Sequence, residues 1–355
     1  MAKIDQFLKA LADHGGSDLH LSTGAPPLMR RDGQLQPFPF RELSARDLEM
    51  LLHEIMRDDW RAQFDETLDL DFAYEIPGVS RFRVNVFQQR KGPGAVFRTI
   101  PAEVLTADQL DLPEAVRGFA RLSKGLVLVT GPTGSGKSTT LAALIDLINE
   151  TRHDHILTIE DPIEFTHPNK KCLVNQREIG TNTRSFAAAL RAALREDPDV
   201  ILVGEMRDRE TIELGITAAE TGHLVFGTLH TNSAPKTVDR IIDVFPADQQ
   251  AQIRSMLAES LKGVVSQVLM RKKEGRGRVA ALEIMVGTSA LTNLIRENKI
   301  HQIPSLIQTG KKDGMQLLDQ HIMDHLMAGT IDASEAYARS HNKQMFLPHL
   351  REAGG

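Results

Sequence analysis

Residues 125–140 read GLVLVTGPTGSGKSTT, and this stretch decides the fold around it. Its apolar residues 126–129 form a short uninterrupted run of the kind that is typical of a buried strand. The run leads into Gly131–Ser138, which matches the phosphate-binding template G-x-x-x-x-G-K-[ST] at every fixed position. Helical spacing follows in Leu141, Leu144, Ile145 and Ile148. Strand, loop and helix therefore succeed one another as a nucleotide-binding loop requires.

The residues of this loop have the chemistry that a bound nucleoside triphosphate needs. Its glycines allow a tight turn that presents backbone N–H groups to phosphate oxygens. Lys137 supplies a positive charge toward the β- and γ-phosphates, and Ser138 offers a hydroxyl to Mg²⁺. The helix that begins there directs its positive end at the phosphates. The predicted nucleotide-binding residues are Gly131, Pro132, Thr133, Gly134, Ser135, Gly136, Lys137, Ser138 and Thr139.

Composition limits the other functions of the chain. Its 355 residues exceed one average domain, so two domains and an appendage are expected. A net charge of −5 and an aromatic fraction of 5% argue against nucleic acid as a partner. The single Cys172 excludes a disulfide framework and fits a reducing cytosol. Without a signal peptide or an apolar run of membrane length, we expect a cytoplasmic protein that reaches a membrane only through a partner.

The sequence pattern divides the chain into three folded parts and a linker. The predicted boundaries are 1–100 for an α+β domain, 101–112 for a linker, 113–287 for a nucleotide-binding core and 288–355 for a C-terminal helical region. The first domain mixes helical periodicity with alternating strands, two of which flank Pro77-Gly78 as a hairpin. The linker is polar and weakly periodic.

In the core, apolar runs alternate with helical patterns, which predicts a mostly parallel sheet covered on both faces. The expected strands are Gly125–Thr130, His155–Ile159, Val200–Val203 and Leu224–Thr228, with a later one within Val279–Val286. Residues Ile253–Leu269 carry apolar side chains at helical spacing and are predicted to form one long, buried helix. The fold class is therefore α/β, with a smaller α+β domain before it and helices after it.

Carboxylates follow two of the predicted strands. Glu160, Asp161 and Glu164 come after the second strand, and Glu205 follows the third. Ligands of an open parallel sheet lie beyond the carboxyl ends of its strands, so these groups are expected near the phosphate loop. Hydrolysis needs a group that orients and deprotonates water, and Mg²⁺ needs oxygen ligands for its water shell. Taken singly, each carboxylate could equally be a helix cap or a surface ion pair.

Histidines and arginines complete the set of candidate residues. The fourth strand begins at His223 and ends at His230, and His230 is the better placed to sense the γ-phosphate or its Mg²⁺-bound water. A structural role is the more common one for a strand histidine, and it fits His223. Arg81, Arg83 and Arg98 of the first domain either form a solvated sheet face or neutralise charge on a phosphate bound to a neighbouring domain or subunit.

Four segments together make the chain similar to the secretion ATPases of the type II and type IV pilus class. They are GPTGSGKST, LTIEDPIEF (157–165), VILVGEMRD (200–208) and GHLVFGTLHTN (222–232). The resemblance implies an RecA-like P-loop domain, an N-terminal PAS-like domain, and ATP with Mg²⁺. It implies that Glu164 is the catalytic base, that Glu205 helps to hold Mg²⁺ and water, and that Arg83 and Arg98 complete the site. The family forms hexameric rings in which ATP turnover shifts the two domains.

Two C-terminal segments resemble the retraction class within this family. Residues 290–297 read ALTNLIRE, where that class carries AIRNLIRE, so Thr292 replaces an arginine; GMQLLDQ (314–320) matches as well. The resemblance implies a homohexameric motor that acts on the inner-membrane pilus platform protein and disassembles a type IV pilus. The alternatives are a pilus extension or type II secretion ATPase, an accessory retraction paralogue, a nucleotide-gated binding module and, with least support, a nucleic-acid translocase.

Overall fold

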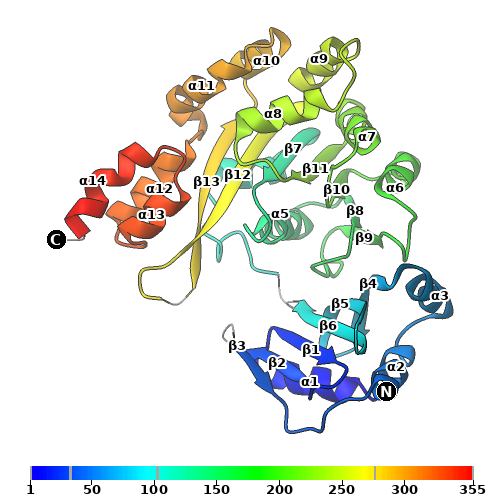
Figure 1. The fold of residues 1–355 in the computed structure, drawn as a ribbon. Helices are drawn as coiled ribbons and strands as arrows, with labels where there is room; N and C mark the ends of the chain where they lie inside the picture. The colour runs from blue at the N-terminus through cyan, green and yellow to red at the C-terminus, as the bar shows by residue number, and fades with distance from the viewer. Residues whose placement is uncertain (1, 32–33, 101–103, 276, 354–355) are drawn as a thin grey trace. The chain divides into compact units, whose positions relative to one another are not determined.

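The computed structural model describes residues 2–31, 34–100, 104–275 and 277–353, and these form two compact units (Figure 1). The first unit holds the N-terminal part of the chain together with the segment Pro162–Thr166. The second unit holds the rest. Of the predicted linker 101–112, residues 101–103 lie outside the described residues, and turns at 107–111 lead into helix α4 (Glu114–Gly118).

The first unit is a six-stranded antiparallel sheet with three helices. Its elements are α1 (Asp5–Asp13), β1 (Asp18–Ser22), β2 (Leu28–Arg31), β3 (Gln34–Pro37), α2 (Ala45–His53), α3 (Asp58–Thr67), β4 (Asp69–Ile76), β5 (Ser80–Gln89) and β6 (Gly92–Ile100). The strand order is β3-β2-β1-β6-β5-β4. Phe82, Val84 and Val86 of β5 are fully buried in the core, so the alternation predicted for this hairpin is confirmed. The opposite face of β5 carries its arginines.

The second unit is a seven-stranded sheet in the order β13-β12-β7-β11-β10-β8-β9. Its strands are β7 (Gly125–Thr130), β8 (His155–Glu160), β9 (Leu173–Glu178), β10 (Val200–Val203), β11 (Leu224–Leu229), β12 (Leu261–Arg271) and β13 (Arg278–Val286). Neighbouring strands run parallel except for β13, which is antiparallel to β12. The predicted fold class and the five predicted core strands are confirmed.

Helices cover both faces of this sheet because its strands are apolar on both sides. The helices of the core are α5 (Lys137–Thr151), α6 (Phe186–Ala193), α7 (Arg209–Glu220), α8 (Ala234–Asp243) and α9 (Gln250–Ser260). On β7, Leu126 and Leu128 share a core cluster with residues of α6 to α9. Val127 and Val129 face the other way and share a cluster with α5. Strand β7, which leads into the phosphate loop, is thus packed against a hydrophobic cluster on each of its faces.

The prediction of one long helix over Ile253–Leu269 is wrong. Helix α9 ends at Ser260, and the chain continues as β12 between β7 and β13. Most residues of β12 are buried because it has a strand on each side and helices on its faces. Such a continuous apolar run fits helical spacing as well as strand spacing, so periodicity alone does not separate the two. Its β-branched residues Val264, Val265 and Val268 were the available sign of a strand.

Helices follow β13, as the sequence predicts. They are α10 (Ser289–Arg296), α11 (Ile303–Thr309), α12 (Leu318–Met327), α13 (Ala333–Arg339) and α14 (Lys343–Ala353). The retraction-like segment forms α10, where the Thr292 hydroxyl donates a hydrogen bond to the Thr288 carbonyl at 3.2 Å. Within the described residues, every helix is too short or too polar to cross a bilayer.

Candidate active site

The phosphate-binding loop lies between the end of β7 at Thr130 and the start of α5 at Lys137. Gly131, Gly134 and Gly136 have φ angles of 143°, 77° and 88°, which side-chain-bearing residues rarely adopt. The Lys137 ammonium donates hydrogen bonds to the carbonyl oxygens of Gly131 at 2.9 Å and Pro132 at 3.2 Å, so it crosses the loop. All nine predicted nucleotide-binding residues therefore belong to one continuous loop and helix start.

Four strand ends bring the sequence motifs to one edge of the sheet. The parallel strands lie in the order β7-β11-β10-β8 (Figure 1). They end beside one another at the phosphate loop, His230, Glu205 and Glu160. The chain beyond β10 is held on both sides, because Gly204 N–H donates to the Ile159 carbonyl and Met206 N–H donates to the Thr228 carbonyl. The motifs thus share an edge through strand order rather than through sequence distance.

Glu205 and His230 form a direct pair at this edge. The Nε2 atom of His230 lies 2.9 Å from Oε1 of Glu205, and Arg207 forms an ion pair with the same carboxylate. Burial raises the pKa of Glu205, but the hydrogen bond from Arg207 and the positive charge around the carboxylate outweigh it, so the net pKa is lowered. Glu205 is therefore ionised at neutral pH. The His230 ring is 44% exposed and is open to a ligand at the same edge.

Glu160, one of the carboxylates expected near the phosphate loop, forms a second polar group with Gln176, which the sequence did not single out. Glu160 accepts hydrogen bonds from the Thr158 hydroxyl at 2.6 Å and from Gln176 Nε2 at 3.2 Å. The Gln176 Oε1 atom accepts the backbone N–H of His167 at 2.8 Å. Gln176 thus ties together the two ends of the acidic segment 160–167. Its strand, β9, is a polar edge strand without apolar alternation, so no periodic signal indicated it.

Glu164 and the arginines belong to the first unit. Glu164 is exposed and lies within Pro162–Thr166. Arg83 and Arg98 face each other across β5 and β6, and both are exposed. Arg98 Nε donates to Oδ1 of buried Asp18 at 2.9 Å. Burial raises the pKa of Asp18, but the hydrogen bonds from Arg98 and Ser17 outweigh it and lower the net pKa, so this carboxylate is a charged anchor for Arg98.

His223 lies at the opposite end of β11 from His230. Its Nδ1 atom is 2.9 Å from the carbonyl oxygen of Ala218, near the end of α7. The same carbonyl also accepts the His223 backbone N–H and the Thr221 hydroxyl, so the ring adds a third contact at the C-terminus of the helix, which is a structural use of the ring. The structure therefore separates His223 and His230 by the length of β11.

The residues around the phosphate loop fit an Mg²⁺-bound nucleotide. Ser138 is in the first turn of α5, and Glu205 follows β10, which lies two strands away from β7. The Ser138 hydroxyl and the ionised Glu205 carboxylate are oxygen ligands of the kind that Mg²⁺ prefers. A Cβ atom on Gly131 would lie 2.3 Å from the carbonyl oxygen of Gln267, so the loop backbone packs directly on the strand behind it. When bound, Mg²⁺ would neutralise charge on the phosphates.

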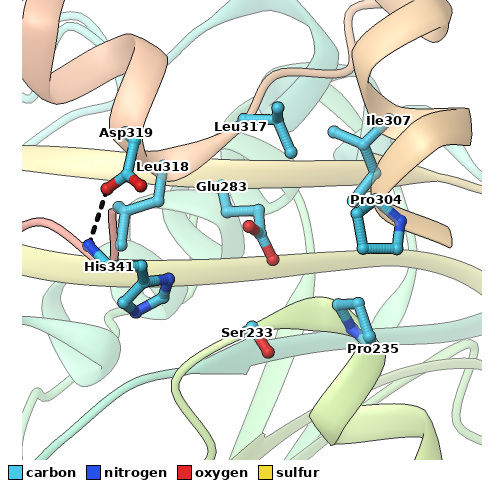
Figure 2. A pocket seen from close by; sticks show the side chains of 9 residues that line it. All are labelled: Ser233, Pro235, Glu283, Pro304, Ile307, Leu317, Leu318, Asp319 and His341. Carbon is cyan, nitrogen blue, oxygen red and sulfur yellow. Dashed lines mark hydrogen bonds between the residues drawn. The ribbon is translucent and has the colours of Figure 1, made fainter. Parts of the chain in front are cut away.

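A separate hollow of about 270 Å³ lies among β13, the start of α8 and the C-terminal helices (Figure 2). The carboxylate of Glu283 points into it and accepts the Ala234 N–H at 2.7 Å, which ties the start of α8 to β13. Burial raises the pKa of Glu283, and the hydrogen bond from Ala234 only partly offsets this effect. Asp319 accepts the backbone N–H of His341 at 2.7 Å, and both residues also line the hollow. The nucleotide loop contributes none of the residues that line it.

Comparison with known proteins shows the family of the chain. The family model described as type II/IV secretion system protein matches residues 3–339. The type IV pilus retraction ATPase PilT of Pseudomonas aeruginosa is 57% identical over 333 residues, which cover 94% of this chain and 96% of that protein. A twitching motility protein of Neisseria gonorrhoeae is 54% identical and covers 90% of this chain and 85% of its own.

A solved structure agrees with the sequence comparison. The crystal structure of the pilus retraction motor PilT with bound ADP matches with a TM-score of 0.90 and 47% identity, covering 97% of this chain and 99% of that one. The match extends over both units and the C-terminal helices. This chain belongs to the type II/IV secretion system protein family.

Proposed function

We propose that this chain is an ATP-hydrolysing motor that drives type IV pilus retraction. The observation that carries the proposal is the phosphate loop on the same sheet edge as the Glu205–His230 pair, in a chain that matches PilT over nearly its whole length. The loop supplies nucleotide binding, and the adjacent carboxylate and histidine supply the groups that respond to the γ-phosphate. Retraction as the output rests on the likeness to PilT.

Within this proposal each site residue has one role. Lys137 and the loop amides bind the phosphates, and Ser138 holds Mg²⁺ together with Glu205, which acts through a water molecule. Glu164 is the base that deprotonates the attacking water. His230 orients Glu205 and senses the γ-phosphate, as its 2.9 Å contact with that carboxylate supports. Arg83 and Arg98 neutralise charge that develops on the phosphates.

The motor acts as a cytoplasmic homohexamer on the inner-membrane pilus platform protein. Exposed Arg83 and Arg98 favour such an assembly, because two like charges lie side by side and the single carboxylate of Asp18, which pairs with Arg98, leaves a net positive charge that gains from a further anionic partner. The ATP-bound state closes the first unit of one chain by differential contacts to these arginines, and product release reopens it. The mechanical output is the alternation of the two states.

The test pairs ATPase assays with twitching of a pilus-bearing bacterium that lacks its own retraction ATPase. The wild-type gene should restore twitching. Lys137→Ala should lose nucleotide affinity, whereas Glu164→Gln should keep it and lose about 10²–10⁴-fold in turnover. Both variants should fail to restore twitching.

Each contrary outcome removes one part of the proposal. A wild-type protein that hydrolyses ATP but restores no twitching would remove pilus retraction as its output. Full turnover in Glu164→Gln would remove the base, and DNA-stimulated hydrolysis would favour a nucleic-acid translocase instead.

A further inference from the structure

Gln267 is a buried amide directly behind the phosphate loop. It lies in β12, which runs parallel to β7, and its neighbour Ser266 pairs with Thr130, the last residue of β7. Gln267 is therefore level with Gly131, where the loop begins. Its exposed fraction is 2%, so its side chain is enclosed on every side.

This one residue contacts the start, the end and the helical continuation of the loop. Its backbone carbonyl oxygen lies against Gly131, where an added Cβ would be only 2.3 Å from that oxygen. Its Nε2 atom donates a hydrogen bond to the Ser135 carbonyl at 2.6 Å. Its Oε1 atom accepts one from the Thr140 hydroxyl at 2.9 Å. Both ends of the amide are thus used by the nucleotide-binding segment.

The bond to Ser135 has a geometric consequence for phosphate binding. The Ser135 carbonyl and the Gly136 N–H belong to one planar trans peptide unit, so they point in opposite directions. When Gln267 holds that carbonyl toward β12, the Gly136 N–H must point away from β12. Gly136 has a φ of 88°, and a glycine there is free to turn unless something fixes its peptide.

We propose that Gln267 is a positioning residue of the ATPase, which orients the Ser135–Gly136 peptide so that its N–H faces the nucleotide phosphates. It does so without touching the nucleotide. The inference rests on the proposed ATPase function. The Ser135 carbonyl can only accept, so it meets the NH₂ end of the amide, and the Thr140 hydroxyl holds the other end by donating to Oε1. Nucleotide affinity therefore depends on a strand outside the loop itself.

The test compares ADP with adenosine, which has no phosphate, on the full-length protein. Gln267→Met keeps the length and volume of the side chain and removes both hydrogen bonds. It should weaken ADP binding by about five- to tenfold, the value of one neutral hydrogen bond, and raise the KM for ATP by a similar factor. Adenosine binding, followed by ligand-observed NMR, should stay unchanged. Gln267→Glu should be worse than Gln267→Met, because its carboxylate oxygen faces the Ser135 carbonyl without a donor.

Two further variants separate positioning from stability. Thr140→Val removes only the bond that holds the Oε1 end of the amide. It should weaken ADP binding less than Gln267→Met does. Ser266→Ala changes a buried polar residue on the same strand and should leave ADP affinity unaltered.

The possible results separate the inference from the proposed function. Gln267→Met with a lowered melting temperature but wild-type ADP affinity would overturn the inference, and so would an equal loss for ADP and adenosine. If wild-type protein binds neither ADP nor ATP, the proposed function fails instead.

Discussion

The parallel strands of the seven-stranded sheet have two sets of ends: an amino edge, where the strands begin, and a carboxyl edge, where they end. These two edges differ in what their polar side chains bind. At the amino edge, Asp199 accepts the His155 backbone N–H at 2.8 Å, and His223 contacts the Ala218 carbonyl. At the carboxyl edge, Glu205 instead bonds the side chains of His230 and Arg207. Strand β10 thus begins after one carboxylate and ends before another, and β11 begins after one histidine and ends before another.

The comparison teaches that the place of a residue on a strand decides its use. Side chains at the amino edge form hydrogen bonds with backbone N–H and carbonyl groups, and so they stabilise the fold. Groups at the carboxyl edge hold one another in position beside the phosphate loop, where parallel sheets bind their ligands. The same two residue types therefore serve stability at one edge and, we propose, chemistry at the other.

The largest expected effect tests whether the carboxyl edge of one chain is complete by itself. Arg83→Ala should lower turnover by about 10³–10⁵-fold if the arginine neutralises phosphate charge. When it is mixed with Lys137→Ala, part of the activity should return, because Lys137→Ala chains still supply Arg83 to an intact phosphate loop in a neighbouring subunit. The measurement is the ATPase rate per subunit against protein concentration.

Matched controls make that outcome clear. Arg90→Ala, in the turn of the same β5–β6 hairpin, should keep wild-type turnover. Subunit exchange is followed with labelled chains in the same mixture, and sizing reports the assembly. A mixture that exchanges subunits but regains no activity would mean that each chain completes its own site.

Local sequence patterns predict the residues that take part in this comparison, but not the contacts between them. The phosphate loop, the strands before it and after it, and the polar residue at each strand end all follow from contiguous residues. Strand order does not, so the Glu205–His230 bond could be expected only in outline. The loop's support from Gln267 was hidden, because its partner Ser135 is 132 residues away. The burial of β12 on both faces also made it read as a helix.

A second, smaller effect contrasts the two carboxylates that flank β10. Glu205→Ala should lower turnover or Mg²⁺ affinity by about 10–100-fold, as removal of an outer-shell metal partner does. Asp199→Ala should keep turnover within about twofold and lower the free energy of unfolding by about 1 kcal/mol, because one backbone hydrogen bond is lost. Mg²⁺ titrations of the ATPase rate and thermal unfolding measure the two quantities.

The contrast fails in a defined way. Glu205→Ala with a normal rate and a lowered melting temperature would make the carboxyl-edge carboxylate structural too. A loss of turnover in Asp199→Ala at unchanged stability would mean that the amino edge also has a role in catalysis.

The smallest effect is expected from the two histidines that flank β11. His230→Ala should lower turnover about tenfold, the value of one hydrogen bond to a charged group, since Arg207 continues to pair with Glu205. His223→Ala should leave turnover within twofold and reduce the free energy of unfolding by about 1 kcal/mol. Because the two variants remove the same kind of side chain from the two ends of one strand, they differ only in the edge that they affect. Equal losses of turnover, measured beside denaturant unfolding, would mean that edge position does not decide the role of a histidine in this sheet.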